Sequence, residues 1–333
     1  MSAVSEGTNA ADVVSARRVT VRTVAGSALR GARRQPVWFL VVGCVLFFGL
    51  ASPYFLTAGN LGNVLVQSSF IGFLAVGMTF IMIDGNIDLT VGATLALAAA
   101  LAVGLQQAGA PPLVGVVAGL AAGAALGTLN GLAVVLTGVD SFIVTLGGLI
   151  GIRGLVFVYT REQSMLTMNG AYTGFGSLAV GPVPVIGILF LLFVFVGQWV
   201  LRRTVHGRNG YAVGGNRDAA TNAGIHVGRH IFLNFLLMGL LAAFAGIMLS
   251  TQMGSATPNL GTNYELWAII SVVLGGTKLQ GGSGSLWGTL GGVLAIGVLR
   301  NGMNLLNVAP FYVYVVLGFV LIATLFIDKF GRR

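Results

Sequence analysis

Charged residues and cysteine are scarce in this chain of 333 residues. Only 8% of the residues are Asp, Glu, Lys or Arg, whereas 56% are hydrophobic. Apolar runs of about 20 residues recur, which is the length that crosses a bilayer. Cys44 is the only cysteine and lies in the first apolar run, which excludes an intrachain disulfide and a thiolate metal cluster. We expect an all-α membrane protein with a packed thiol and no redox chemistry.

Patterns that would indicate a catalytic or nucleotide-binding site are also missing. The glycine-rich segment 274–285 contains no Gly-Lys-Ser or Gly-Lys-Thr, so we expect no ATP site of the phosphate-loop type. His206, His226 and His230 lie in one polar segment without acids at ligand spacing, and we expect them at the surface, with no metal site. No catalytic His or Ser accompanies the carboxylates, which argues against hydrolysis.

We interpret the net charge of +9 as a signal of how the chain is oriented in the membrane, and not as a signal of nucleic-acid binding. Arginines flank the apolar runs, and no zinc, helix-turn-helix or RNA-binding pattern accompanies them, so we expect no nucleic-acid partner. Lysine and arginine concentrate at 17–34, 202–229 and 329–333, and such excess marks cytoplasmic segments. Both termini should therefore be cytoplasmic.

Ten apolar segments satisfy that orientation, although eight crossings would give the same parity. Residues 1–35 are polar and resemble a disordered basic cytoplasmic tail, residues 36–328 form the membrane domain, and 329–333 form a cytoplasmic C-terminus. The segment least secure in this prediction is the eighth, which is short. The predicted spans are 37–56, 64–84, 89–106, 113–137, 141–160, 183–201, 231–252, 266–277, 285–306 and 311–327.

Glycine recurs every four residues along the fourth predicted span. A ridge without side chains lets a neighbouring helix backbone approach closely, so we interpret it as a packing device rather than a ligand site. A similar spacing occurs at the start of the ninth span. The glycines are Gly115, Gly119, Gly123, Gly127 and Gly131, then Gly284, Gly288 and Gly292.

Residues 202–230 form the one long polar interruption, with five arginines and a single acid. Within this segment, the sequence from Asn216 to Gly224 predicts a short helix that begins with an asparagine cap and ends at a glycine in the left-handed conformation. Ala219, Ala220 and Ala223 would give it a small, smooth face. A polar segment of this kind is suited to contact a partner protein, although a merely solvated loop is the alternative.

Four separated segments resemble the inner-membrane permease family of ABC sugar importers, which includes ribose, xylose and galactose permeases. The first is similar to that family's Gly-Gly-Ile-Asp-Leu-Ser-Val-Gly signature, with Asn86 and Thr90 as departures and Asp84 where a hydroxyl residue is more usual. Together with shorter matches, the resemblance covers about residues 50–328 in order. The segments are 77–92, 130–155, 207–225 and 264–304.

This resemblance implies a multi-pass protein of the bacterial cytoplasmic membrane with about ten helices, of the type II importer kind. It implies a second permease subunit, an extracytoplasmic sugar-binding protein and surrounding lipid. An ATPase with two nucleotide-binding domains would bind ATP and magnesium, so this chain needs no cofactor and is not catalytic. The polar segment would be the coupling element that docks on the ATPase, through Arg208, Tyr211, Asn216, Arg217, Asp218, Ala219, Ala220, Ala223 and Gly224.

Polar side chains inside the apolar runs are candidates for the solute pathway, and each could instead satisfy backbone at a helix contact. The carboxylates of Asp84 and Asp88 are costly inside a bilayer unless each lies at a helix terminus, has a partner or contacts water. Asp88 could cap the third span. A proton-coupled secondary transporter using Asp84 or Asp88 is the main alternative, and a passive pore is another. Glu265 would stabilise a helix dipole. The pathway candidates are Gln67, Ser68, Ser69, Asp84, Asp88, Asn130, Thr145, Asn301 and Asn304.

Overall fold

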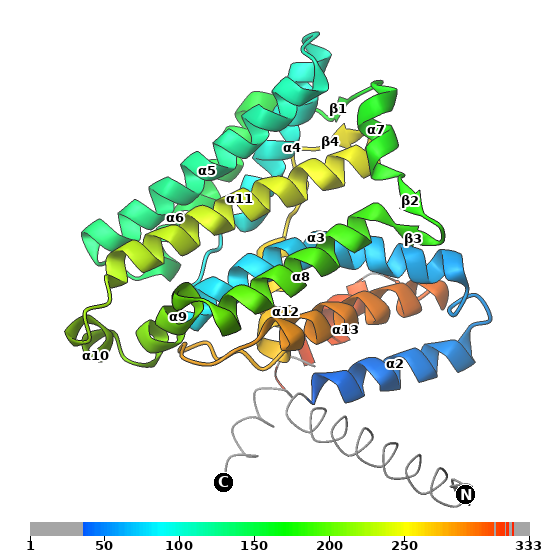
Figure 1. The fold of residues 1–333 in the computed structure, drawn as a ribbon. Helices are drawn as coiled ribbons and strands as arrows, with labels where there is room; N and C mark the ends of the chain where they lie inside the picture. The colour runs from blue at the N-terminus through cyan, green and yellow to red at the C-terminus, as the bar shows by residue number, and fades with distance from the viewer. Residues whose placement is uncertain (1–35, 310, 317, 320–321, 323–333) are drawn as a thin grey trace, which may run out of the picture.

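The structure is a computed structural model that describes residues 36–309, 311–316, 318–319 and 322. The predicted tail at 1–35, the predicted C-terminal segment 329–333 and much of the predicted tenth span lie outside the described residues. The described part of the chain is a bundle of α-helices (Figure 1). Its helices are α2 Val37–Ala51, α3 Ala58–Ile83, α4 Val91–Gln107, α5 Pro112–Thr137, α6 Ser141–Thr160, α7 Gly170–Gly176, α8 Val185–Arg203, α9 Val205–Gly215, α10 Arg217–Asn222, α11 Val227–Met253, α12 Tyr264–Leu274 and α13 Leu286–Leu305.

Two short antiparallel strand pairs fasten the loops at one end of the bundle. β1 (Met165–Leu166) pairs with β4 (Ser255–Ala256), and β2 (Ala179–Val180) pairs with β3 (Val183–Pro184). The first pair joins the segment after α6 to the segment after α11, so it ties together loops that are distant in the sequence.

Nine of the ten predicted apolar segments coincide with α-helices in the described part of the chain. Five helices, α3, α5, α6, α8 and α11, are long and apolar enough to cross a membrane, while α2, α4 and α12 are apolar but shorter. The chain is thus a multi-pass membrane protein. The polar segment 202–230 holds two helices, α9 and α10, of which only α10 was predicted.

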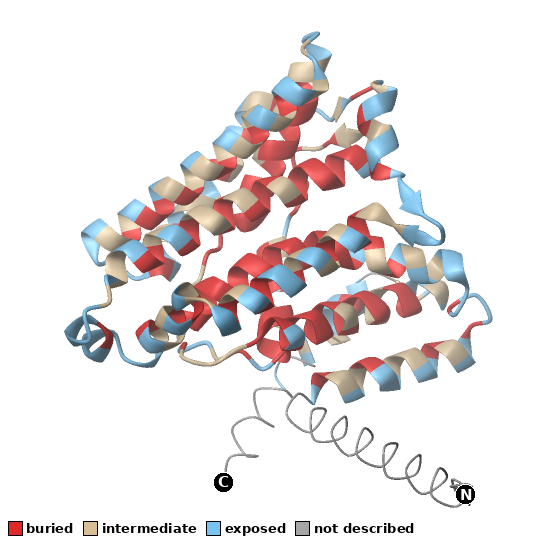
Figure 2. Cartoon of the chain, viewed as in Figure 1, coloured by how far each residue is buried: buried red, intermediate tan, exposed pale blue. Residues whose placement is uncertain are grey.

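Burial divides the helices into central and peripheral ones (Figure 2). In their most apolar windows, 89% of α3 and 67% of α11 is buried inside the chain, against 22% for α5 and for α6. The outward faces of α5 and α6 carry exposed aliphatic side chains such as Leu136, Ile150 and Val158. Such faces are compatible with hydrocarbon, because every backbone group of a helix is already paired.

The predicted glycine ridge of α5 is confirmed as a helix contact. A Cβ on Gly115 or Gly119 would meet the carbonyl oxygens of Ala102 or Ala98 in α4, and one on Gly127 would meet the backbone of Phe235 in α11. In α13, Gly288 and Gly292 lie against the backbone at the end of α12, whereas Gly284 precedes the helix. Absent side chains therefore set how closely α5 approaches α4 and α11.

Two non-helical links interrupt the bundle and meet each other. One, at 84–90, joins α3 to α4, and the other, at 275–285, joins α12 to α13. The amide of Gly282 donates to the carbonyl oxygen of Ile83 at 2.9 Å, and Gly85 and Gly281 both have positive φ, at 75° and 87°. Irregular backbone is tolerated in a membrane protein only where protein or water satisfies it, and here each link helps to cover the other.

Candidate functional site

The polar segment has the local structure that its capping residues dictate. The Asn216 side chain accepts from the amide of Ala219 at 2.9 Å and so caps α10. Gly224 follows the helix with φ of 83°, and the amide of Ile225 returns to the carbonyl of Ala220 at 3.1 Å. The predicted asparagine cap and left-handed glycine are both confirmed.

The alanine face of α10 is smaller than the sequence predicted. Ala219 and Ala223 are exposed, but Ala220 is only 3% exposed and packs inward. Ala220 is buried because a helix of six residues needs at least one side chain that packs against the bundle. Arg208 and Asp218 are exposed, and they remain accessible to a partner.

Helix α9 and the start of α10 contact both links. The Tyr211 hydroxyl donates to the carbonyl oxygen of Gly284 at 2.9 Å, and Arg217 Nη2 donates to Asn86 Oδ1 at 3.0 Å. Gly214 lies so close to the carbonyl of Ile83 that a Cβ there would overlap it. Burial raises the pKa of Tyr211, opposed by the charge of Arg202, so its hydroxyl keeps the proton that it donates.

A buried polar cluster lies beside the same contact and joins α3, α9 and α11. The Asp84 carboxylate, 1% exposed, lies 3.0 Å from His230 Nε2 and accepts from the side-chain amide of Asn234. The Asn234 oxygen lies 2.8 Å from His206 Nε2. Among the described residues, Asp84 and His230 form the only pair of acidic and basic side chains within salt-bridge distance.

The prediction that these histidines lie at the surface was wrong for His230, which is buried, and for His206, which is half-buried; only His226 is exposed. The folding back of α9 against α11 encloses them. Burial lowers the pKa of His206; the hydrogen bond to the Asn234 oxygen and the charge of Asp84 oppose this, while His230 adds to it. Within the described chain no three acidic, histidine or cysteine residues are placed to hold a metal.

Asp88 is held within its own link rather than at the helix start. Its Oδ1 accepts from the amide of Thr90 at 2.8 Å and from the Thr90 hydroxyl at 2.6 Å, and Asn130 Nδ2 donates to that hydroxyl oxygen at 2.9 Å. Thr90 is the N-cap of α4 and makes no side-chain cap bond itself, and Asp88 accepts from its amide, so the carboxylate supports the start of α4 from within the link. The Asp88–Thr90–Asn130 chain also fixes the link against α5.

Other pathway candidates also have partners within the bundle. Thr145 donates to the carbonyl of Ser141 at 2.7 Å, and Ser69 donates to that of Leu65 at 2.6 Å. Asn301 exchanges two side-chain hydrogen bonds of 2.9 Å with Asn60 and thereby joins α13 to α3. These contacts account for the burial of their side chains, and a role in the pathway stays a prediction for them.

Ser68, a pathway candidate, and Glu265, which was expected to stabilise a helix dipole, each have a buried oxygen that lacks a partner among the described residues. Ser68 is 1% exposed and faces α13 where Gly297 leaves room for it, and its hydroxyl has no hydrogen bond. Glu265 lies in the first turn of α12, as the dipole interpretation expected, but it is 7% exposed and its Oε2 is unpaired. An unpaired buried oxygen has a desolvation cost that a hydrogen bond would remove.

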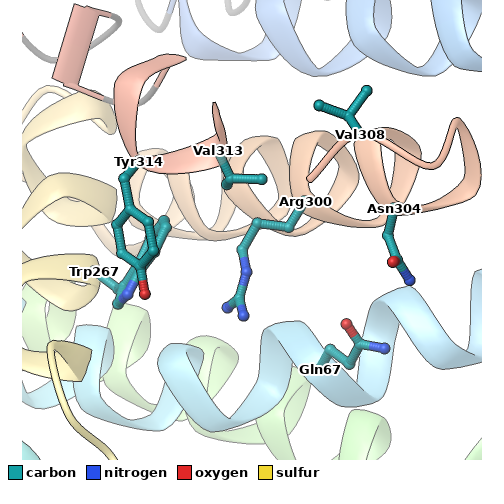
Figure 3. A pocket seen from close by; sticks show the side chains of 7 residues that line it. All are labelled: Gln67, Trp267, Arg300, Asn304, Val308, Val313 and Tyr314. Carbon is teal, nitrogen blue, oxygen red and sulfur yellow. The ribbon is translucent and has the colours of Figure 1, made fainter. Parts of the chain in front are cut away.

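Gln67, in the third turn of α3, and Asn304 come together at some distance from Asp84, which follows the last residue of that helix. Both line a cavity of about 190 Å³, with Trp267, Arg300 and Tyr314 on the remaining sides (Figure 3). The guanidinium of Arg300 lies 4.9 Å from the centre of the Trp267 ring. Sequence reasoning missed Arg300, although an arginine inside an apolar run is itself a signal of a functional site.

Comparisons with known proteins identify relatives along almost the whole chain. The family described as "Branched-chain amino acid transport system / permease component" matches residues 60–325. The chain is 43% identical to the ribose import permease protein RbsC of Bacillus subtilis (strain 168), an alignment that covers 86% of this chain and 89% of the relative.

Two further relatives come from Escherichia coli (strain K12). The ribose import permease protein RbsC is 40% identical, with 84% of this chain and 88% of the relative covered. The D-allose transport system permease protein AlsC is 37% identical, with 88% and 90% covered. No solved structure matches this chain.

Proposed function

The chain belongs to the permease-component family of branched-chain amino acid and related transport systems, and we propose from this premise that it is the membrane-spanning permease subunit of an ATP-driven monosaccharide importer. Relatives at 37–43% identity carry the names of ribose and allose permeases, which favours a sugar over an amino acid. The observation that carries the proposal is the contact of α9 and α10 with the two non-helical links.

That contact supports a coupling role for the polar segment. Exposed Arg208, Asp218 and Ala219 form a surface that a cytoplasmic ATPase could bind, while Tyr211 and Arg217 hold the inner side to the links. A rigid element with one face on the motor and one on the bundle can pass movement between them. Nucleotide and magnesium would bind to the ATPase, and this subunit would catalyse no reaction itself.

The remaining parts of the proposal concern assembly and orientation. We place the chain in a bacterial cytoplasmic membrane with both termini and the α9–α10 segment inside, because lysine and arginine concentrate there. A second permease subunit, taken as an identical copy, would complete the path, and a sugar-binding protein would deliver solute outside. Asn130 and Thr145 would belong to the walls of the path.

A proton-coupled transporter is not favoured, and the contacts of its two candidate carboxylates agree with that. Asp84 is enclosed by His230 and Asn234, and Asp88 is engaged by Thr90. A carboxylate that must load and release protons during transport needs alternating access to water. Neither side chain is more than 1% exposed.

Reconstitution into liposomes tests the proposal. The chain would be purified with the ATPase that co-purifies with it, sealed in vesicles with the binding protein outside, and given radiolabelled D-ribose, D-allose or L-arabinose. We expect uptake of one of them to require ATP on the ATPase side. Uptake at full rate without the ATPase, driven by a pH gradient, would overturn the proposal.

Docking is tested by charge reversal with a matched control. Arg208→Glu should abolish co-purification of the ATPase, whereas Arg161→Glu, at an exposed position beyond the far end of α6, should leave it intact. Equal retention of the ATPase by both variants would refute docking at Arg208.

A further inference from the structure

The cavity between α3, α12 and α13 is lined by a guanidinium with unused hydrogen-bonding capacity. Within the described part of the chain, Arg300 makes no hydrogen bond and no ion pair, and its contact is with the Trp267 ring. A guanidinium presents five N–H donors in one plane. Its placement in the apolar ninth span therefore calls for a ligand, water or a lipid headgroup to satisfy it.

The position of the cavity relates it to the ends of the bundle. Gln67 lies 17 residues before Asp84 along α3, which is about 25 Å of helix. Trp267 is in the first turn of α12, while Arg300 and Asn304 are in the last turns of α13. In the proposed orientation, the cavity lies in the external half of these three helices, and the α9–α10 segment is at the other end.

The lining has the composition that recognises a neutral polyhydroxylated ligand. Gln67 and Asn304 each offer an amide with donors and an acceptor, and the Arg300 guanidinium offers donors only. Trp267 and Tyr314, whose ring centres are 5.5 Å apart, form an apolar wall on one side (Figure 3). No carboxylate lines the cavity among the described residues, so nothing there competes with a ligand for Arg300.

The volume of the cavity limits the size of the ligand that it can hold. The cavity holds about 190 Å³, below the ~300 Å³ at which pockets for drug-sized ligands begin, so it suits one small ring rather than an oligosaccharide. We propose that Gln67, Arg300 and Asn304 form a low-affinity receiving site for a single neutral monosaccharide at the external end of the permease. This inference rests on the proposed function, because it takes the transported solute to be a sugar.

Hydrogen bonds of this kind are individually weak, which is what a transit site needs. Binding must be favourable enough to receive the solute and weak enough to release it inward. Loss of one uncharged hydrogen bond changes a binding constant about three- to tenfold. We therefore expect Gln67→Ala and Asn304→Ala to reduce sugar uptake per ATP hydrolysed by about that factor, and Arg300→Gln to reduce it more.

The experiment uses the assembled complex in liposomes and compares uptake with ATP hydrolysis. Gln107→Ala, at the external end of α4 and outside this cavity, is the matched control and should retain full uptake. Co-purification of the ATPase reports whether each variant complex assembles, because Gln67 and Asn304 lie in α3 and α13 and not in the α9–α10 segment.

The outcomes separate this inference from the proposed function. If the unaltered complex shows no ATP-dependent uptake of any monosaccharide, the proposed function fails. If it transports sugar but Gln67→Ala, Asn304→Ala and Arg300→Gln all behave like Gln107→Ala, the receiving site is refuted. Arg300→Lys keeps the positive charge of Arg300 but not the planar geometry of its guanidinium. If this variant, unlike Arg300→Gln, transported only an anionic sugar such as ribose 5-phosphate, the assignment to a neutral ligand would be overturned.

Discussion

The Asp84 cluster permits a stability prediction with a defined magnitude. Asp84 is buried and is held by His230 from one side and Asn234 from the other. His230→Ala removes one of these two partners while the carboxylate stays enclosed. Breaking a buried charged pair by removing one partner typically costs ~3–5 kcal/mol, and a hydrogen bond to a charged group is worth ~1.5–3 kcal/mol.

Because Asn234 still donates to Asp84 in that variant, the lower end of the first range applies. We expect His230→Ala to reduce the free energy of unfolding by about 3 kcal/mol. Asp84→Asn keeps an oxygen in the same position and removes the charge that needed the partner, so we expect a loss of about 1 kcal/mol. In the double variant the two losses should not add, and the coupling should be about 2 kcal/mol.

Equilibrium unfolding of the purified chain in mixed detergent micelles measures these four species. His226→Ala provides the matched control, because His226 is exposed and its side chain does not cap α11; the change there should stay within about 0.5 kcal/mol. Additive losses in the double variant, or an equal loss at His226, would show that Asp84 and His230 do not stabilise each other.

Three further predictions concern packing and pH. Gly214→Ala should separate α9 from the links and lower sugar-coupled ATP hydrolysis at least tenfold, whereas Gly215→Ala, which has open space for a Cβ, should not; equal activities would contradict the contact. Gly127→Val should lower the yield of folded protein through the α5–α11 contact, in contrast to Gly147→Val, whose Cβ position is open; fluorescence-detected size exclusion compares them. Burial lowers the pKa of His206, so its contribution to stability is present above the unfolded histidine pKa of about 6.5 and is lost as the pH falls through that value towards the lower folded pKa. His206→Asn should therefore flatten the decline of the unfolding free energy between pH 8 and 5, and an unchanged slope would refute the assignment.

Local features were predictable because their causes lie within a few residues. The cap at Asn216, the glycine at 224 and the ridge that includes Gly127 all follow from spacing, and the structure agrees with each. The resemblance of separated motifs also indicated the family. Helix α9 was missed because its four glycines disfavour a helix in isolation, and its packing on the links stabilises it instead.

Side-chain partners distant in the sequence could not be predicted in this way. Asp84 and His230 are 146 positions apart, and Arg217 and Asn86 are 131 apart. Periodicity places a residue on a helix face but does not say which other helix that face meets. The histidines were therefore predicted to be exposed, because the polar composition of 202–230 does not indicate that α9 folds back against the bundle.

Two of the three helices that border the cavity, α3 and α13, are also contacted by α9 at or beside their opposite ends. Gly214 lies against the end of α3 at Ile83, and Tyr211 binds Gly284, just before α13 begins. Gln67 and Asn304 lie on these same helices, in the halves away from α9. A helix transmits displacement along its axis because its internal hydrogen bonds keep it rigid, whereas the glycine-bearing links can change φ and ψ at low cost. In the proposed importer, movement of α9 would therefore alter the separation of α3 and α13 at the cavity, so that ATP-driven closure and inward release of the sugar from the cavity need no further connecting element.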